Sequence, residues 1–208
     1  MASNRKSTVI RKKQIVDAAR KLMIKYGSEH ITIRRLAKEV KITEAAIYRH
    51  FKSKRDILSF LTEHITETML EEIGRTADGP IPSLEVINDT LKNHLSIIEQ
   101  RKGMSFQILA EIISFGDKKL NRQVAEFIEK YVYRLELLLY EGVSAGFVRN
   151  DINLSSAALL LFGMIQGLVN VWAINNYNFD LVEKYSSLWE VFRKSVEKPL
   201  PVQPGRQT

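Results

Sequence analysis

The sequence predicts an all-α protein, and three observations support this. Apolar residues recur three and four positions apart along most of the 208 residues, which is the spacing of helices with one buried face. No segment shows the alternation of apolar and polar residues that is typical of strands. Several glycines and prolines stand where these apolar stripes end, as helix terminators do. With 45% hydrophobic residues, the chain can build one large or two small domains.

The first helix is expected from residue 11 to residue 26. Gly27 follows it directly and is a typical helix terminator. Residues 1–10 are basic, and no apolar stretch follows them. We therefore expect a flexible arm there rather than a secretion signal. The side chains expected on the buried face of this helix are Ile15, Ala18, Ala19, Leu22 and Tyr26.

Residues 32–51, TIRRLAKEVKITEAAIYRHF, contain two short helical patterns separated only by Lys41 and Ile42. Helices this short are not stable alone and must pack against neighbouring helices. Two short packed helices joined by a turn of three or four residues form a helix-turn-helix motif. The second pattern turns Ile47 and Phe51 inward, which leaves its polar and small residues on the outside.

The rest of the chain also reads as helices. The sequence Ser53-Lys54-Arg55-Asp56 resembles a capping box that opens a fourth helix, which continues to about Gly74. Two prolines and a glycine in residues 78–82 then break the pattern. Further helices are expected from Ser83 to near Gly103, around Phe106 to Gly116, from about Leu120 to Gly142, from Leu154 to Ile174 and from about Leu181 to Val196.

The charge is distributed unevenly along the chain. Residues 1–60 carry 16 Lys and Arg against 5 Asp and Glu, whereas residues 61–208 carry 15 against 19. The net charge of +7 therefore comes entirely from the N-terminal part. A basic module on a mildly acidic body predicts a polyanionic partner for that module alone.

The helix-turn-helix segment and its neighbours resemble the DNA-binding domain of the TetR family of transcriptional regulators. The resemblance covers about residues 8–68, and its most specific matches are residues 32–37, 46–51 and 52–54. The family usually has glycine in the turn, where this chain has Lys41. A left-handed Lys41 would cost on the order of 1 kcal/mol relative to glycine.

The resemblance implies an N-terminal three-helix DNA-binding domain, residues 11–55, with the helix-turn-helix at 32–51. A C-terminal helical domain that binds an effector and dimerises would occupy residues 56–197, and residues 198–208 are expected to be a disordered tail. The implied function is that of a cytoplasmic, homodimeric repressor. A small hydrophobic effector, for which a fatty acyl compound is one candidate, would release it from a pseudo-palindromic double-stranded DNA operator.

The expected DNA contacts fall into two groups. A reading helix needs small or polar residues at its N-terminal end so that it approaches the bases closely. Caps at helix N-termini and basic side chains hold the phosphates, and the resemblance implies phosphate contacts for several of them. Base contacts are expected from Thr43, Glu44, Ala45 and Ala46. Phosphate contacts are expected from Thr32, Arg34, Tyr48, His50 and Lys54. Arg49 is expected to point outward, where it could reach bases or phosphates.

Residues 154–174 form the most apolar stretch of the chain, and no charged residue lies between Asp151 and Asp180. Such a stretch is long enough to span a bilayer. Its two amides, and the lack of flanking cationic clusters, favour burial in a soluble helical bundle instead. The resemblance implies that the last two helices form the dimer interface. The residues expected there are Leu160, Gly163, Gly167, Leu188, Trp189 and Phe192.

The resemblance implies an effector site among the C-terminal helices, and their aromatic content suits a hydrophobic ligand with few polar anchors. Glu111 is a candidate anchor for a cationic ligand, but its helical stripe also reads as a solvent-facing surface. The full set of expected lining residues is Phe106, Glu111, Tyr131, Gln166, Asn170 and Trp172.

No catalytic residue, metal site or cofactor is expected. The chain lacks cysteine, and its histidines stand apart from other possible ligands. It also lacks a nucleophile triad in sequence and a phosphate-binding glycine loop. Two alternatives to the repressor remain open: an architectural protein that binds DNA without sequence preference, and a small-molecule-binding helical protein without sequence-specific DNA binding. A membrane protein is a more distant alternative.

Overall fold

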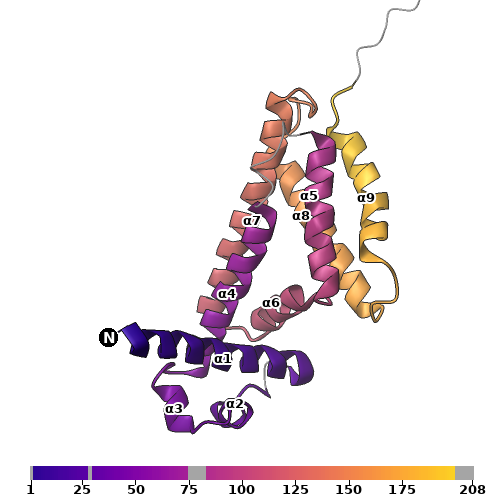
Figure 1. Ribbon diagram of the computed structural model, residues 1–208. Helices are drawn as coiled ribbons and strands as arrows, with labels where there is room; N and C mark the ends of the chain where they lie inside the picture. Colours follow the sequence, from indigo (N-terminus) through magenta and orange to yellow (C-terminus); the bar gives the residue numbers. More distant parts are fainter. Residues whose placement is uncertain (1, 28–29, 75–82, 200–208) are drawn as a thin grey trace, which may run out of the picture. The chain divides into compact units, whose positions relative to one another are not determined.

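The computed structural model describes residues 2–27, 30–74 and 83–199, which form helices joined by short connections (Figure 1). Between its described residues no strand pairs with another, apart from one isolated bridge between Val148 and Glu197. The described helices are α1 (Ala2–Tyr26), α2 (Ile33–Val40), α3 (Glu44–Tyr48), α4 (Lys54–Gly74), α5 (Leu84–Gln100), α6 (Met104–Ser114), α7 (Lys118–Ser144), α8 (Leu154–Ile174) and α9 (Leu181–Val196).

Helix α1 begins at Ala2, nine residues before its expected start. The segment expected to be a flexible arm is therefore helical from residue 2 to residue 10. The physical reason is visible in the sequence, because residues 2–26 contain neither glycine nor proline to interrupt the helix. The helix ends as expected at Gly27, which has a φ of 84° and donates its N–H to Met23 O at 2.8 Å.

The chain divides into two compact units, and the division differs from the expected boundary after residue 55. The first unit contains residues 1–72 and 101–130, and the second contains residues 73–100 and 131–208. Helix α6 and the first half of α7 therefore belong with the helix-turn-helix. Sequence order did not indicate this, because α6 packs against α1, which lies some 80 residues earlier in the chain.

The core of the first unit is built around α1. Ile15 and Ala19 of α1 are fully buried, and so are Leu36 of α2 and Ile47 of α3. Phe51, also expected inward, is only 5% exposed and packs edge-on against Phe60 of α4. Tyr26 was expected to be buried, but it is exposed. It is 46% exposed, because it stands in the last turn of α1, and Val16 and Met23 fill the buried stripe instead.

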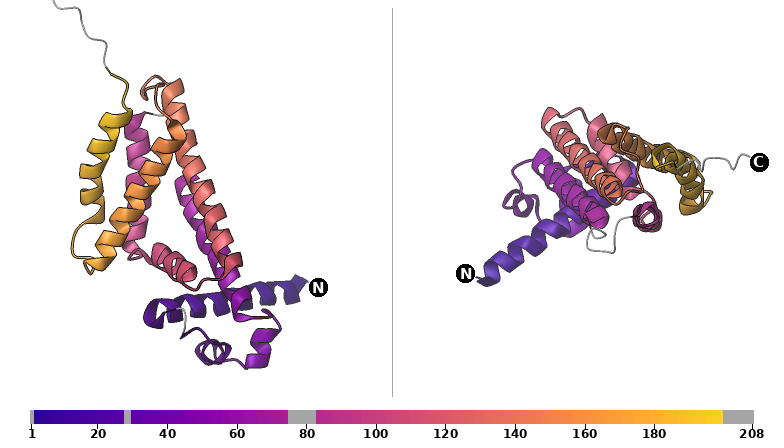
Figure 2. Two further views of the ribbon diagram at one scale, coloured as in Figure 1. Left: turned by 180° about the vertical axis from the view of Figure 1, so that it is seen from behind. Right: turned by 90° about the horizontal axis from the view of Figure 1, so that it is seen from above.

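The second unit is a helical layer in which α9 packs on both α5 and α8 (Figure 2). Its core includes Leu91, Leu95, Leu135 and Ile165, all fully buried. The end of α9 is tied down by two backbone hydrogen bonds, from Arg149 N–H to Val196 O and from Lys198 N–H to Phe147 O, both 2.9 Å. These bonds fix the first residue of the expected tail.

Two expected features lie outside the described residues: the break at residues 78–82 and the tail from residue 200 onward. Helix α8 is the one described helix long and apolar enough to cross a membrane, and 44% of its most apolar window is buried by the rest of the chain. A core helix of a soluble protein has the same composition, so α8 alone is weak evidence for a membrane span.

Candidate nucleic-acid interface and effector core

The helix-turn-helix is held by side-chain caps at both of its helices. Thr32 Oγ1 accepts the N–H of Arg35 at 3.2 Å, and Thr43 Oγ1 accepts the N–H of Ala46 at 3.1 Å. Each cap satisfies a backbone donor that the helix leaves free and directs its remaining N–H groups outward. The short helix α3 is thereby fixed at its N-terminal end, the end expected to approach bases.

The turn between α2 and α3 depends on a left-handed residue. Lys41 has φ 58° and ψ 47°, so the strained conformation anticipated for this position is present. The N–H of Ile42 donates to Ala37 O at 3.0 Å, which closes a Schellman-type cap at the end of α2. This bond fixes the entry angle of α3, and its geometry requires the residue before Ile42 to be left-handed.

The expected base-contacting residues form a single exposed face. Thr43, Glu44 and Ala45 are exposed, and Ala46 is half-buried. Tyr48 is 54% exposed, so it is available to a partner rather than packed in the core. Arg34 and Arg49 are also exposed. The structure therefore brings the expected contacts together around α3 and the start of α2.

His50 lies among cations. Burial lowers the pKa of its imidazole below 6.5, and the neighbouring charges of Arg11, Lys12 and Arg49 lower it further. Within the described chain its Nδ1 is buried without a hydrogen-bond partner. Lys12 also lies over the rings of Phe51 and Phe60, at 5.6 Å from each centroid. The N-terminal half of α1 thus adds positive charge beside His50 and Phe51, which directly follow α3.

Lys54 is placed by a contact that sequence reasoning missed. Its ammonium lies 4.9 Å from the ring centroid of Phe115, at the end of α6. The next residue, Arg55, pairs with Asp117 at 3.7 Å. The capping box expected at the start of α4 is present in modified form: Ser53 Oγ accepts the N–H of Asp56, and the carboxylate of Asp56 accepts the N–H of Lys52. The connection between α6 and α7 therefore holds the start of α4.

Comparison with known proteins decides the family. Residues 15–59 match the model of bacterial regulatory proteins of the tetR family, and residues 61–195 match the model of the C-terminal region of YsiA-like proteins. The chain belongs to the TetR family of transcriptional regulators. The helix-turn-helix is accordingly its DNA-binding element, and the all-α fold with an N-terminal helix-turn-helix followed by a helical C-terminal region is confirmed.

Similar proteins in the TetR family differ in their roles. The nucleoid occlusion factor SlmA of Vibrio atlanticus (strain LGP32) is 27% identical over 198 residues, 95% of this chain and 100% of that protein. The fatty acid metabolism regulator protein of Bacillus subtilis (strain 168) is 24% identical over 178 residues, 86% and 91% of the two chains. These relatives are regulators rather than enzymes.

Solved structures show the same fold. The regulator FadR of Bacillus subtilis, in complex with stearoyl-CoA, has a TM-score of 0.76 at 23% identity and covers 86% of this chain and 96% of that one. The complex of SmeT with triclosan has a TM-score of 0.79 at 18% identity and covers 93% and 99%. SmeT represses a multidrug efflux pump of Stenotrophomonas maltophilia.

The outer face of α8 carries the apolar surface that the TetR resemblance led us to expect. Leu160 is 61% exposed and Ile174 is 80% exposed. Gly163 and Gly167 lie between them, and a Cβ atom added at either glycine would meet, beyond the adjacent residues and backbone of its own helix, no atom of the described residues within 4 Å. On helix α9, which packs on α8, Val191 is 71% exposed. We call these five residues the α8 face.

Trp189 and Phe192, which we expected at the dimer interface, are covered within the subunit itself. They are 2% and 4% exposed, because the apolar stripe of α9 packs against α5 and α8 of the same chain. Leu188 is half-buried beside them. A helical apolar stripe indicates that a face is covered, but its spacing does not reveal whether the cover is the same chain or a second one.

The six expected effector-lining residues do not form one site within either unit. Phe106 and Glu111 lie on α6 in the first unit, with Phe106 buried and Glu111 half-buried. Trp172 is buried, but its indole N–H donates to Phe179 O at 2.8 Å and closes the connection between α8 and α9. Asn170 is exposed and Gln166 is half-buried, so Asn170 is not a lining residue of the core.

Among the residues expected to line the effector site, Tyr131 lies beside other buried polar side chains inside the second unit. It is fully buried, and its ring lies 5.9 Å from that of His94 and 5.1 Å from that of Phe162. Burial, together with the nearby Tyr131, raises the pKa of the fully buried Tyr185. His94 and Tyr185 were missed, although His94 falls on the apolar stripe of α5, where a polar residue is unusual. We call Tyr131, His94 and Tyr185 the polar core.

The described residues contain no cluster of three or more His, Asp or Glu side chains that would hold a metal ion.

Proposed function

We propose that this TetR-family regulator is a homodimeric repressor that releases a pseudo-palindromic operator when a hydrophobic effector occupies its second unit. The observation that carries the proposal is the exposed, capped α3, surrounded by basic residues, in a chain that also exposes the apolar α8 face. A DNA-reading helix without a dimer interface would address only one half-site.

The DNA contacts divide by chemistry. Arg34 and Lys54 would neutralise phosphates, which gives affinity without sequence preference and a strong dependence on salt. The N-terminal end of α3 would read the bases, with Glu44 accepting from a cytosine amino group and Ala45 contacting a thymine methyl. The N-cap role of Thr43 is compatible with this, because the cap leaves the exposed face of α3 unobstructed.

The α8 face would form the core of the dimer interface. Glycines at positions 163 and 167 would allow the backbone of a partner helix to approach closely, and the leucine and isoleucine on either side would be buried by it. Two α8–α9 pairs would then form a four-helix bundle. A dimer presents two copies of α3, so its operator would have two related half-sites.

The polar core is our proposed place for the polar end of the effector. Tyr185 is fully buried, and its hydroxyl has no hydrogen-bond partner among the described residues. Leaving a buried hydroxyl unsatisfied costs about 1–3 kcal/mol, so a ligand that accepts its hydrogen bond recovers that energy. The surrounding aliphatic and aromatic side chains would bury the apolar part. A fatty acyl compound has this combination of parts. Like related TetR regulators, the protein would act in the cytoplasm.

The test is a salt-titrated binding assay on duplexes selected from the source genome. Arg34→Ala and Lys54→Ala should weaken binding to all duplexes and reduce the slope of log affinity against log salt by about 1 each. Glu44→Ala should change the preferred sequence and leave the salt slope unaltered. Equal effects of both kinds of variant on selected and random duplexes would refute the division between phosphate and base contacts.

Two further measurements separate the alternatives. An architectural protein would bind random and selected duplexes equally at fixed salt. A protein that binds small molecules without reading DNA would bind dodecanoic acid with no shift of any duplex. The proposed function requires a preferred duplex and its release by a hydrophobic ligand.

A further inference from the structure

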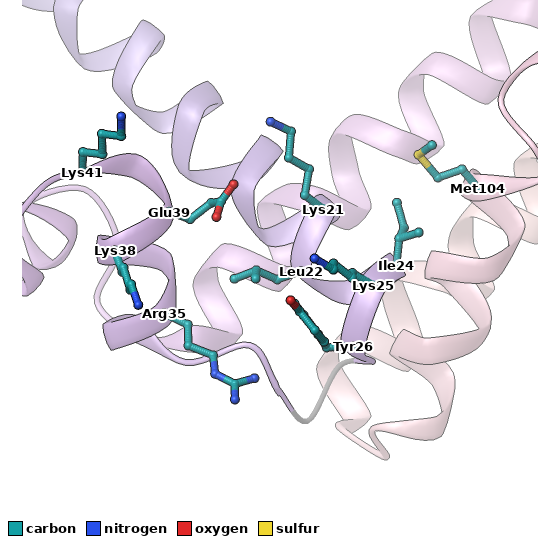
Figure 3. A pocket seen from close by; sticks show the side chains of 10 residues that line it. All are labelled: Lys21, Leu22, Ile24, Lys25, Tyr26, Arg35, Lys38, Glu39, Lys41 and Met104. Atoms are coloured by element: carbon teal, nitrogen blue, oxygen red, sulfur yellow. The ribbon is translucent and has the colours of Figure 1, made fainter.

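A basic groove crosses the first unit at a place that the DNA contacts do not use. It has a volume of about 940 Å³ and is lined by side chains of α1, α2 and the start of α6 (Figure 3). Ligand sites in proteins are typically clefts of about 300–1,000 Å³, so the groove has the size of a small-molecule site. Its lining residues are Lys21, Leu22, Ile24, Lys25, Tyr26, Arg35, Lys38, Glu39, Lys41 and Met104.

The charge of this basic groove is strongly positive. Four lysines and an arginine face a single carboxylate, that of Glu39. Within the described parts of the chain, no ion pair neutralises any of the four lysines. Like charges gathered on adjacent helices repel one another, and a bound polyanion removes that repulsion. The electrostatics therefore favour a ligand with several clustered negative charges.

The groove also has an aromatic and aliphatic surface. The ring of Tyr26 is flanked by the Lys25 ammonium at 5.0 Å from its centroid and by the Arg35 guanidinium at 5.9 Å. Leu22 is buried beneath them, and Ile24 is 42% exposed. Cations beside an aromatic surface suit a ligand that combines anionic groups with a planar or apolar part.

A DNA duplex is a poor match for this basic groove. None of its ten lining residues is among those expected to contact DNA around α3. Within the first unit α1 separates α6 from α2 and α3 (Figure 1). A groove that reaches Met104 of α6 therefore extends across α1, away from the reading helix, and a rigid duplex seated on α3 does not enter a concave site of that kind.

We propose that this groove binds a small molecule that carries two or more clustered phosphates beside an aromatic or aliphatic group. The lysines would bind the phosphate oxygens as point charges, and Arg35 would add paired hydrogen bonds. Tyr26 and Ile24 would contact the apolar part. Because α1, α2 and α6 all line the groove, its occupant would brace the helix-turn-helix against α6. The proposal does not depend on the effector site in the second unit.

The test is isothermal titration calorimetry of the full-length protein at low ionic strength, with inorganic tripolyphosphate and, separately, with ATP. The variant Lys25→Ala/Lys38→Ala removes two exposed cations of the groove, and we expect it to weaken tripolyphosphate binding by about tenfold or more. The matched control, Lys118→Ala/Arg122→Ala, removes two exposed cations of α7 in the same unit. It should change the affinity by about twofold or less, because screened long-range attraction is weak.

The two probes distinguish the sources of the phosphates. If Tyr26→Ala weakens ATP binding and leaves tripolyphosphate binding unchanged, the occupant is a nucleotide-like molecule. If it weakens neither, while the lysine variant weakens both, the groove binds phosphates without Tyr26, and the proposed contact of Tyr26 with an apolar group is overturned.

Four results would overturn the proposal. The first is that neither probe binds, and the second is that the lysine variant and its control lose equal affinity for tripolyphosphate. The third is tighter binding of a polyglutamate peptide than of tripolyphosphate, and the fourth is that Lys25→Ala/Lys38→Ala loses more affinity for a DNA duplex than for tripolyphosphate. The third result would assign the groove to an acidic protein partner, and the fourth would assign it to DNA.

Discussion

Replacing Lys41 by glycine should stabilise the protein, although it deletes a side chain. Lys41 has φ 58° and ψ 47°, a left-handed conformation that costs a residue with a Cβ about 1–2 kcal/mol. Glycine avoids that cost, but it also increases the conformational entropy of the unfolded chain, which costs about 0.4–1 kcal/mol. The difference predicts a gain of about 0.5–1 kcal/mol in the free energy of unfolding.

The assay is thermal and urea unfolding followed by circular dichroism, at one protein concentration, because dimerisation would make the midpoint depend on concentration. For a chain of this length the gain corresponds to a midpoint higher by about 1–4 °C. Two controls isolate the cause. Lys41→Ala removes the charge and keeps the strain, and Lys38→Gly places glycine inside α2, where it costs about 1 kcal/mol.

If Lys41→Gly were no more stable than Lys41→Ala, the backbone strain assigned to this turn would be refuted. If Lys41→Gly were more stable than Lys41→Ala but not more stable than the unaltered protein, the lysine side chain would compensate for its conformation through contacts with α1 or α2. Lys102 offers an internal check, because it is also left-handed, with a φ of 51°. Lys102→Gly should therefore show a gain of similar size.

Three other changes have defined outcomes. Because the pKa of His50 lies below 6.5 in the folded chain, acidification through this value favours the unfolded state, and the free energy of unfolding should fall as the pH drops below 6.5. His50→Gln should flatten that fall in urea titrations, and no flattening would exclude His50 as its source. Leu160→Glu should give monomers in sedimentation equilibrium with unchanged helicity, since Leu160 is 61% exposed; a persistent dimer would exclude the α8 face. Tyr185→Phe removes a buried hydroxyl without a hydrogen-bond partner among the described residues, so it should raise the unfolding midpoint and weaken the binding of dodecanoic acid. The exposed control Tyr140→Phe should change neither. A lower midpoint for Tyr185→Phe would indicate a structural role for the hydroxyl.

The helix-turn-helix was predictable because its signals are local. Thr32 and Thr43 each cap the helix that follows by accepting the N–H of the residue three positions ahead. Ile47 and Phe51 lie one turn apart, so a window of twenty residues contains the whole motif. The left-handed turn was considered through the TetR resemblance, because the family usually has glycine where this chain has Lys41. The exposure of Tyr26 was not predicted, because the helical spacing of apolar residues continues into the last turn of α1. The side chains that cover the rest of the buried stripe do not extend as far as Tyr26.

Features formed by distant segments were not predictable from the sequence. The basic groove combines residues 21–26, 35–41 and 104, and no periodicity links them. Trp189 and Phe192 were expected against a second subunit and are covered by their own chain, because an apolar stripe does not identify the surface that covers it. The polar core joins His94, Tyr131 and Tyr185 from three helices, and no spacing along the chain links them.

The two open glycines of α8 have an energetic implication for the single subunit. Glycine inside a helix is about 1 kcal/mol less favourable than alanine, so Gly163 and Gly167 together weaken α8 by roughly 2 kcal/mol. The described part of the subunit has room for larger residues there, because a methyl group at either position would meet none of its atoms within 4 Å beyond the local helix. Alanine at these positions should therefore improve folding of the lone subunit while obstructing whatever polypeptide lies against it. If the α8 face is the dimer interface, the cost of these glycines to the lone subunit is offset only in the dimer.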